Sequence, residues 1–354
     1  MPVYNGGRYL DETIESVISQ DVTDFEFVIV DDGSTDATPQ ILQRWAARDP
    51  RMVVIHLPAN GGIPRALNRG LAVARGKYVT RQDCDDLCMR GRLRRQVDVL
   101  EQEADVVLVS SNHDLIDADG NFLATVVCQN PPEVTAYLLT FGNAVSGGGS
   151  QAMFRRNLVS DVGGFREDYA FANDYEFWAR LSRRGRIVTL PIVGTRVRLH
   201  DRRVTILYSE RQRRYSMATS RWMITELLGR PITEKEEDAV ASVWRAEGRP
   251  VVAGCADVVF REAYAQFSKA NASRAHHRRV RFETASHWFR SAVALARNGK
   301  FAYAAIHLAY SVRWHPCALP AGAIFMVGRI FMHSRNAALR RLRPRSLPGS
   351  RSTH

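Results

Sequence analysis

Short apolar runs alternate with helical patterns over the first 110 residues of the chain. Runs rich in β-branched residues lie at 25–30, 52–57, 77–81 and 105–110, and the segments at 63–74 and 90–102 space their apolar residues as amphipathic helices do. Strands that alternate with helices of about ten to fifteen residues form right-handed crossovers onto a mostly parallel sheet. The pattern therefore predicts an α/β fold whose sheet is flanked by helices.

Aspartate-rich turns follow two of the predicted strands. Asp31 and Asp32 come directly after the first strand, and Asp83, Asp85 and Asp86 come after the strand at 77–81. Ligands of open α/β sheets bind beyond the carboxyl ends of the strands, so we expect both groups at one edge. Clustered carboxylates repel one another unless a cation neutralises them, and a hard divalent cation prefers oxygen ligands. Solvated turn or helix-cap aspartates are the alternative interpretation.

The charge of the chain is concentrated near its C-terminal end. The formal net charge is +12, and residues 284–354 contain eleven Lys or Arg and no Asp or Glu. Five cysteines without a C-x-x-C pair favour neither a disulfide framework nor a zinc site, and are typical of a reducing cytoplasmic compartment. No run of about 18 apolar residues predicts a membrane-spanning helix.

Six motifs, in their order and spacing, resemble family 2 glycosyltransferases with the GT-A (Rossmann-like) fold, of the non-processive bacterial type. They read MPVYNGGRYLDETIESVISQ, FEFVIVDDGSTDAT, NGGIPRALNRGLAVARGKYVTRQDCDD, RLRRQV, VGGFREDYAFANDYEFWARLSRRG and VRLH. The resemblance implies a catalytic domain at 1–205, with a nucleotide-binding half at about 1–112 and an acceptor half at about 113–205. Relatives carry an apolar strand before MPVYN, so we expect Met1 to be an internal methionine of a longer natural polypeptide.

The resemblance also implies a site for a nucleoside-diphosphate sugar. The base pocket would be lined by Pro2, Val3 and Tyr4, with Asp31 accepting a hydrogen bond from the base and Asp32 supporting it. In the D-x-D element, Asp83 would lie near the ribose and Asp85 would bind Mn²⁺ or Mg²⁺. Further candidates are Asp83 and His200 as metal ligands, and Asp86 as a supporting residue or helix cap.

Asp174 occupies the position of the family's general base. An acceptor hydroxyl has a pKa far above 7 and needs a base within hydrogen-bond reach, which explains why a carboxylate is required. Asn173 stands where the family has an acid. As an alternative, Asp174 is a helix N-cap, and the two roles are compatible. Candidates for the acceptor or phosphate side are Asn173, Arg198, Gly148 and Gly149.

The resemblance thus implies an inverting, metal-dependent transfer of a sugar to a hydroxyl of a saccharide or lipid-linked saccharide, in surface polysaccharide assembly. The Q-x-x-R-W element of processive synthases is not found. Alternatives are a non-catalytic sugar-nucleotide-binding or scaffold protein, and a nucleotidyltransferase. Nucleic acid is not an expected partner, because the basic run matches no recognised module.

After residue 205 the pattern becomes helical and polar. We expect a helical C-terminal region at 206–333 and a basic, disordered tail at 334–354. The apolar segment at 319–333 followed by arginines is also compatible with attachment to an anionic membrane surface, where each basic residue contributes about 1 kcal/mol. The sequence therefore predicts a cytoplasmic protein. A peripheral position on the inner face of the cytoplasmic membrane is compatible with the basic C-terminal segment, and a helix packed on the protein is the alternative for 319–333.

Overall fold

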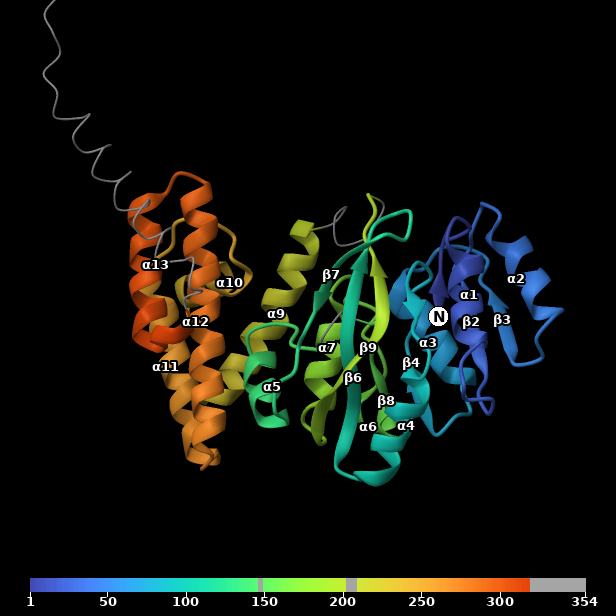
Figure 1. The fold of residues 1–354 in the computed structure, drawn as a ribbon, viewed down its shortest axis with the longest axis horizontal. Helices are drawn as coiled ribbons and strands as arrows, with labels where there is room; N and C mark the ends of the chain where they lie inside the picture. The colour runs from blue at the N-terminus through green and yellow to red at the C-terminus, as the bar shows by residue number, and fades with distance from the viewer. Residues whose placement is uncertain (146–148, 202–208, 319–354) are drawn as a thin grey trace, which may run out of the picture. The chain divides into compact units, whose positions relative to one another are not determined.

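A computed structural model describes residues 1–145, 149–201 and 209–318 of the chain (Figure 1). The chain divides into two compact units, Met1–Pro231 and Ile232–His354, here called unit 1 and unit 2. Unit 1 is an α/β structure, and the described part of unit 2 is helical.

The first sheet of unit 1 is parallel and has the order β1-β2-β3, formed by Pro2–Val3, Phe27–Asp31 and Met52–His56. Helices α1 (Leu10–Ile18), α2 (Thr38–Ala46) and α3 (Ile63–Val73) connect and cover these strands, as the alternating pattern predicted. Pro39 lies in the first turn of α2, where a missing N–H costs no helical hydrogen bond. The apolar faces of α1 and α2 meet the sheet through Leu10, Ile14 and Leu42, all fully buried.

The second sheet of unit 1 is mixed and has the order β4-β8-β6-β9-β5, with β7 beside β6. Its strands are β4 (Tyr78–Thr80), β5 (Leu87–Cys88), β6 (Val106–Ile116), β7 (Phe122–Val126), β8 (Met153–Arg155) and β9 (Arg186–Arg198). Only β6 and β9 pair in parallel, whereas β4 pairs antiparallel with β8. The predicted α/β class is therefore confirmed, but the expectation of one mostly parallel sheet is wrong for this half, because β4 takes its partner from much later in the chain.

Helices α4 (Arg92–Gln102), α5 (Pro132–Leu139), α6 (Leu158–Val162), α7 (Asn173–Leu181) and α9 (Ser209–Leu228) complete unit 1. Aromatic side chains of α7 fill its second core, where the ring of Phe177 lies 4.3 Å from that of Phe165. Helix α9 packs on this core, and the hydroxyl of Ser220 donates to the carbonyl of Thr140 at 3.2 Å. These contacts place α9 in unit 1, which extends to Pro231. The catalytic domain expected at 1–205 lies within this unit and stays a prediction.

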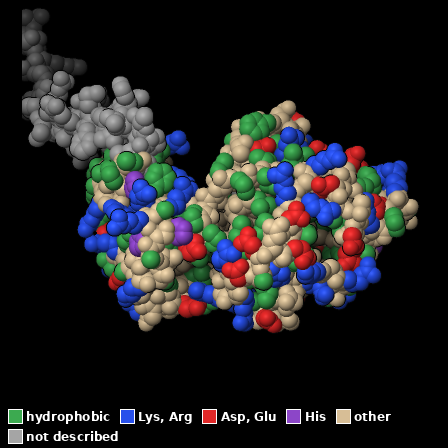
Figure 2. Space-filling view, turned by 60° about the horizontal axis from the view of Figure 1, so that its bottom comes forward, with side chains coloured by type: hydrophobic (Ala, Val, Ile, Leu, Met, Phe, Trp, Pro, Cys, Tyr) green, Lys and Arg blue, Asp and Glu red, His purple; other side chains and the backbone are tan. Residues whose placement is uncertain are grey.

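Unit 2 contains α10 (Glu234–Arg245), α11 (Ala253–Ala270), α12 (Arg274–Arg297), α13 (Phe301–Trp314) and a short 3₁₀ turn, Pro316–Ala318. Its core surrounds the buried indole of Trp288, which Phe260 meets edge-on at 6.0 Å. Helix α12 ends before Asn298, and Gly299, at a positive φ, is separated from α13 by one residue. Figure 2 shows Lys and Arg side chains among hydrophobic ones on the visible face of this unit.

The predictions for 319–333 and for the tail at 334–354 lie outside the described residues. Among the residues that the structure describes, no helix is both long and apolar enough to cross a membrane.

A cavity of about 840 Å³ lies inside unit 1 between β2 and β4. Its wall includes Met1, Val28 and Tyr78, together with residues of α3 and α4. Strand β1 pairs only with Val30 and Asp31 at the end of β2, whereas β3 pairs with all five residues of β2. The cavity thus occupies the place beside the beginning of β2 that a longer neighbouring strand would fill.

Candidate active site

Asp31, the last residue of β2, and Asp32, directly after it, are buried and serve different neighbours. One carboxylate oxygen of Asp31 accepts a hydrogen bond from the backbone N–H of Ser34 at 3.0 Å, and the other lies 2.9 Å from Nδ1 of His56. Asp32 accepts the backbone N–H groups of Gly61 and Gly62 at 2.9 and 2.8 Å. Asp32 therefore ties the turn after β2 to the loop that leads into α3.

The turn after β4 holds Asp83 and Asp85, as the strand pattern predicted. The backbone N–H of Asp83 donates to the hydroxyl of Ser150 at 3.0 Å. One oxygen of its carboxylate accepts hydrogen bonds from Nε and Nη2 of Arg81, at 3.0 and 2.9 Å. The Asp83 charge is thus balanced by a guanidinium that follows β4 directly.

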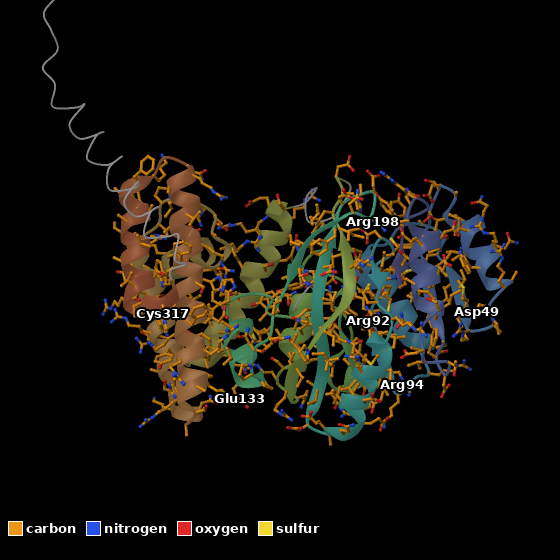
Figure 3. All side chains as sticks on the ribbon, in the orientation of Figure 1. Asp49, Arg92, Arg94, Glu133, Arg198 and Cys317 are labelled. Carbon is orange, nitrogen blue, oxygen red and sulfur yellow. The ribbon has the colours of Figure 1, made fainter. Side chains whose placement is uncertain are left out.

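Asp85 meets the residues that follow β9. Oδ2 of Asp85 lies 2.9 Å from Nε2 of His200, and its backbone carbonyl accepts Nε of Arg198 at 3.1 Å. The ring of Tyr9 lies 5.2 Å from the imidazole, and the guanidinium of Arg198 lies 4.6 Å above the same tyrosine ring. Arg198, labelled near the upper end of β9 in Figure 3, also forms an ion pair with Glu12 at 2.6 Å. The arginine and the histidine of the VRLH motif therefore both contact the D-x-D turn.

Asp86 is fully enclosed, and one of its oxygens accepts the backbone N–H of Arg198 at 3.0 Å. Burial, followed by the charges of Asp85 and Asp83, raises the pKa of Asp86 to about 8. Strand β5, not a helix, begins directly after it, so Asp86 caps no helix and instead fixes the end of β9 to the turn.

Asp174 lies in the first turn of α7, one residue inside the helix. The N-cap is Ala172, whose φ of 52° places it in the left-handed region, so the N-cap interpretation of Asp174 is wrong. The side-chain amide of Asn143 donates to Oδ2 of Asp174 at 2.9 Å. Burial raises the pKa of this carboxyl, while the positive charge of Arg81 opposes the increase. An alanine held at positive φ is strained, and such strain concentrates at functional sites.

The remaining predicted residues are distributed around these groups. Pro2 and Val3 are buried in β1, with Val3 in the first core, whereas Tyr4 is exposed. Asn173 is buried, and its Oδ1 lies 3.3 Å from Nη1 of Arg81. Gly149 lies against Arg81, and Gly148 is outside the described residues.

The structure also brings in residues that the sequence reasoning did not select: Tyr9, Glu12, His56, Arg81 and Asn143. Arg81 had the clearest sequence signal, because it is the only cation within the acid-rich stretch TRQDCDD.

Asp85 and His200 are the pair best arranged to share a metal ion. In the described part of the chain, no three His, Cys, Asp or Glu side chains form a metal-binding group. The carboxylate of Asp85 nevertheless fits Mn²⁺ or Mg²⁺, since such ions prefer oxygen ligands and bind through one or two carboxylates when a phosphorylated substrate completes their coordination. The imidazole of His200, 2.9 Å from this carboxylate, is the nearby nitrogen ligand. The donor set therefore fits an ion shared with a ligand.

The fold and these paired motifs define the class of the protein as an α/β transferase of the GT-A type. A sequence model of Glycosyl transferase family 2 matches residues 1–163. This match confirms the resemblance found in the sequence for residues 1–163.

Three comparisons illustrate the relationship. An uncharacterized glycosyltransferase of Haemophilus influenzae is 28% identical over 237 residues, which is 64% of this chain and 72% of that protein. The putative teichuronic acid biosynthesis glycosyltransferase TuaG of Bacillus subtilis is 33% identical over 146 residues, which is 41% of this chain and 57% of TuaG. The crystal structure of S. aureus TarS 1–349 aligns with a TM-score of 0.52 at 21% identity, over 87% of this chain and 88% of the other. The last comparison shows the fold alone.

Proposed function

We propose that this protein is an inverting, metal-dependent glycosyltransferase that uses a nucleoside-diphosphate sugar. The observation that carries the proposal is that three segments meet at one place. They are the turn after β4, the residues after β9 and the start of α7. The match to Glycosyl transferase family 2 supports glycosyl transfer, and this convergence supports the assignment of one group to each task that the reaction requires.

The donor side would use the aspartates of the two turns. Asp31, with Pro2, Val3 and Tyr4, would receive the base, Asp32 would support that turn, and Asp83 would lie near the ribose. Asp85 and His200 would hold Mn²⁺ or Mg²⁺, with Asp83 as a further candidate. Such an ion neutralises the negative charge that develops on a departing diphosphate.

The acceptor side would use Asp174 as the general base. Its carboxylate would accept the proton of an acceptor hydroxyl while the hydroxyl oxygen bonds to the anomeric carbon from the face opposite the diphosphate. The bond between the anomeric carbon and the diphosphate oxygen breaks in the same step and keeps its electron pair on the diphosphate. Attack from the opposite face inverts the anomeric configuration. Asn173, Arg198 and the glycines at 148 and 149 would border the acceptor or phosphate.

We further propose a saccharide or lipid-linked saccharide acceptor and the addition of a single sugar, in surface polysaccharide assembly. The name of TuaG, which refers to teichuronic acid biosynthesis, supports a polysaccharide context. The chain spans just over half of that relative, so the acceptor of the whole protein is part of the proposal.

Thermal unfolding with a panel of UDP-, GDP- and dTDP-sugars tests the donor side. The panel includes UDP-GlcNAc, since a TarS structure contains it. Each sugar is measured with Mn²⁺, Mg²⁺ or EDTA. A ligand at about 100 times its Kd should stabilise the fold by roughly 2.7 kcal/mol. We expect one nucleotide to give a metal-dependent shift that Asp85→Ala abolishes.

Turnover then separates an enzyme from a binding protein. With the donor that binds best, wild-type protein should release the nucleoside diphosphate, and Asp174→Asn should lower kcat by about 10²-fold or more. Donor binding without turnover in the presence of saccharide acceptors would instead indicate a non-catalytic sugar-nucleotide-binding protein.

A further inference from the structure

Arg81 connects the two halves of the candidate active site through a single buried guanidinium. Its side chain is 9% exposed. Nε and Nη2 donate to Oδ1 of Asp83, and Nη1 lies 3.3 Å from Oδ1 of Asn173, the first residue of α7. Asp174 follows directly in the same helical turn. One rigid group therefore touches both the donor-side carboxylate and the helix end that carries the proposed base.

Gly149 provides the space in which this guanidinium lies. A Cβ atom built on Gly149 would lie 2.2 Å from Nε and 2.3 Å from Cζ of Arg81, far inside van der Waals contact. The backbone of Gly149 is not in the left-handed region, so its conformation alone would admit an alanine. The glycine is thus required for room, and the next residue, Ser150, accepts the backbone N–H of Asp83.

The side chain at position 173 determines whether Arg81 has a second charged partner there. Asn173 offers a neutral carbonyl oxygen, so among the described residues Asp83 is the carboxylate that forms an ion pair with this guanidinium. Arginine presents planar, fixed donors that can bond two acceptors at once, whereas a lysine ammonium acts as a point charge on a flexible stem. The contact to Asn173 therefore orients the guanidinium and does little to neutralise its charge.

We propose that Arg81 is a positioning residue that fixes the separation between Asp83 and the start of α7. A bound donor and the carboxylate of Asp174 are thereby held at the distance and orientation that the reaction needs. This inference rests on the proposed function of Asp174. Because Arg81 acts through two other groups, its loss should lower the rate of the chemical step more than it weakens donor binding.

Four variants test the role of the guanidinium: Arg81→Lys, Arg81→Gln, Gly149→Ala and, as the matched glycine control, Gly70→Ala. A Cβ on Gly70 would make only ordinary contacts, at 3.5 Å from Val30 and 3.8 Å from Val28. Hydrolysis or transfer of the donor that stabilises wild-type protein best is measured as kcat and KM. We expect Arg81→Lys and Gly149→Ala each to lower kcat by about tenfold or more, with donor KM changed about threefold at most. Gly70→Ala should retain the wild-type kcat.

The Lys variant separates geometry from charge. If Arg81→Lys keeps the wild-type kcat, the charge alone suffices and the proposal is overturned. A wild-type kcat in Gly149→Ala, which removes no charge, would overturn it as well. If Arg81→Gln and Gly149→Ala raise donor KM and lower kcat in equal proportion, Arg81 is a donor-binding group and not a positioning residue.

Position 173 offers a second pair in case the Arg81 variants unfold. Asn173→Ala removes only the oxygen that Nη1 approaches and should lower kcat several-fold, whereas Asn173→Asp keeps an acceptor and should retain more activity than the alanine variant. Equal kcat values for the two would contradict the proposal.

Asp174→Asn is measured in parallel. Full activity in that variant refutes the proposed function itself, whereas an inactive Asp174→Asn beside fully active Arg81 and Gly149 variants refutes only the role of Arg81.

Discussion

Nε2 of His200 lies 2.9 Å from Oδ2 of Asp85, although the two residues are separated by 115 positions in the sequence. The side chain of His200 is 10% exposed and that of Asp85 is 24% exposed. The imidazole also meets the ring of Tyr9, so its position is fixed from two sides. This pair joins the residues after β9 to the turn after β4, and it is where we propose that an ion shared with a ligand binds.

Replacing His200 by alanine should therefore weaken metal-dependent nucleotide binding. We expect the affinity for UDP, or for the nucleotide that the panel selects, to fall about 10- to 100-fold in the presence of Mn²⁺. Binding measured in EDTA should be nearly the same in variant and wild type. Isothermal titration checks both conditions, and an unchanged Mn²⁺ dependence in His200→Ala would remove His200 from the site.

The activity should depend on pH through Asp174. Burial raises the pKa of this carboxyl above its ordinary value of 3.8. A general base must be ionised, so kcat should fall as the pH is lowered through the raised pKa of Asp174. The acidic limb of the pH profile of kcat should therefore lie at a higher pH than an exposed aspartate would give. A pH profile of kcat measures this limb. A limb at or below the ordinary value would contradict the assignment of Asp174 as base.

Unit 2 should lose stability on mild acidification. The ring of His287 stacks on Trp244 at 3.5 Å, and burial followed by the charge of Arg290 lowers its pKa to about 3. Burial lowers the pKa of His307, beside Ser291, to about 4. Both pKa values in the folded protein lie below the value of 6.5 in the unfolded chain, so between the folded and unfolded pKa values the unfolded chain binds more protons. The free energy of unfolding therefore falls as the pH drops below about 6.5.

Each of these two histidines should lower the free energy of unfolding by about 1–2 kcal/mol when the pH is lowered to about 5. Urea unfolding at pH 7 and pH 5, followed by the fluorescence of the unit 2 tryptophans, measures the loss. His287→Gln and His307→Gln should each flatten the pH dependence even where they lower stability at pH 7. A dependence as steep in the double variant as in wild type would show that other groups cause it.

Asp32 should contribute to stability rather than to chemistry. Its two oxygens accept the N–H groups of Gly61 and Gly62 and are almost fully buried. Asp32→Ala leaves both donors without a partner and should cost about 2–4 kcal/mol, whereas Asp32→Asn keeps one acceptor and should cost less. Thermal unfolding without ligand compares the two variants, and equal stabilities for alanine and wild type would contradict this role.

The cavity beside β2 should accept an added strand. The amino group of Met1 donates to the carbonyl of Val28 at 2.8 Å, and burial lowers its pKa to about 5. An engineered extension of about five Val and Ile residues before Met1 would continue this ladder, fill the cavity and replace the buried amine by a peptide N–H. A gain of about 2 kcal/mol would raise the melting temperature by roughly 4–8 °C. A Gly-Ser extension of equal length is the control, and an equal or smaller effect of the apolar extension would contradict the prediction.

The sequence predicted the first half of unit 1 well because its elements are specified locally. The strand after 25 and the turn with Asp31 and Asp32 follow from β-branched runs and polar breaks that lie within one segment. The antiparallel pairing of β4 with β8 could not be predicted in this way, since it depends on a partner more than 70 residues away. The resemblance supplied the residues of the D-x-D turn, but periodicity says nothing of where the Arg81 side chain points. Its neighbours, Gly149 and Asn173, become visible only when distant segments are packed together.

The bond between Asp32 and the loop before α3 affects the thermodynamics of ligand binding. Two backbone amides are already held in place, so a nucleotide that binds beside this turn does not have to order that loop. Fixing one residue costs about 1–2 kcal/mol of conformational entropy, and this part of the cost is met during folding and not during binding. We therefore expect different nucleotides to be distinguished at this end by fit to a rigid wall, with little adjustment of the main chain.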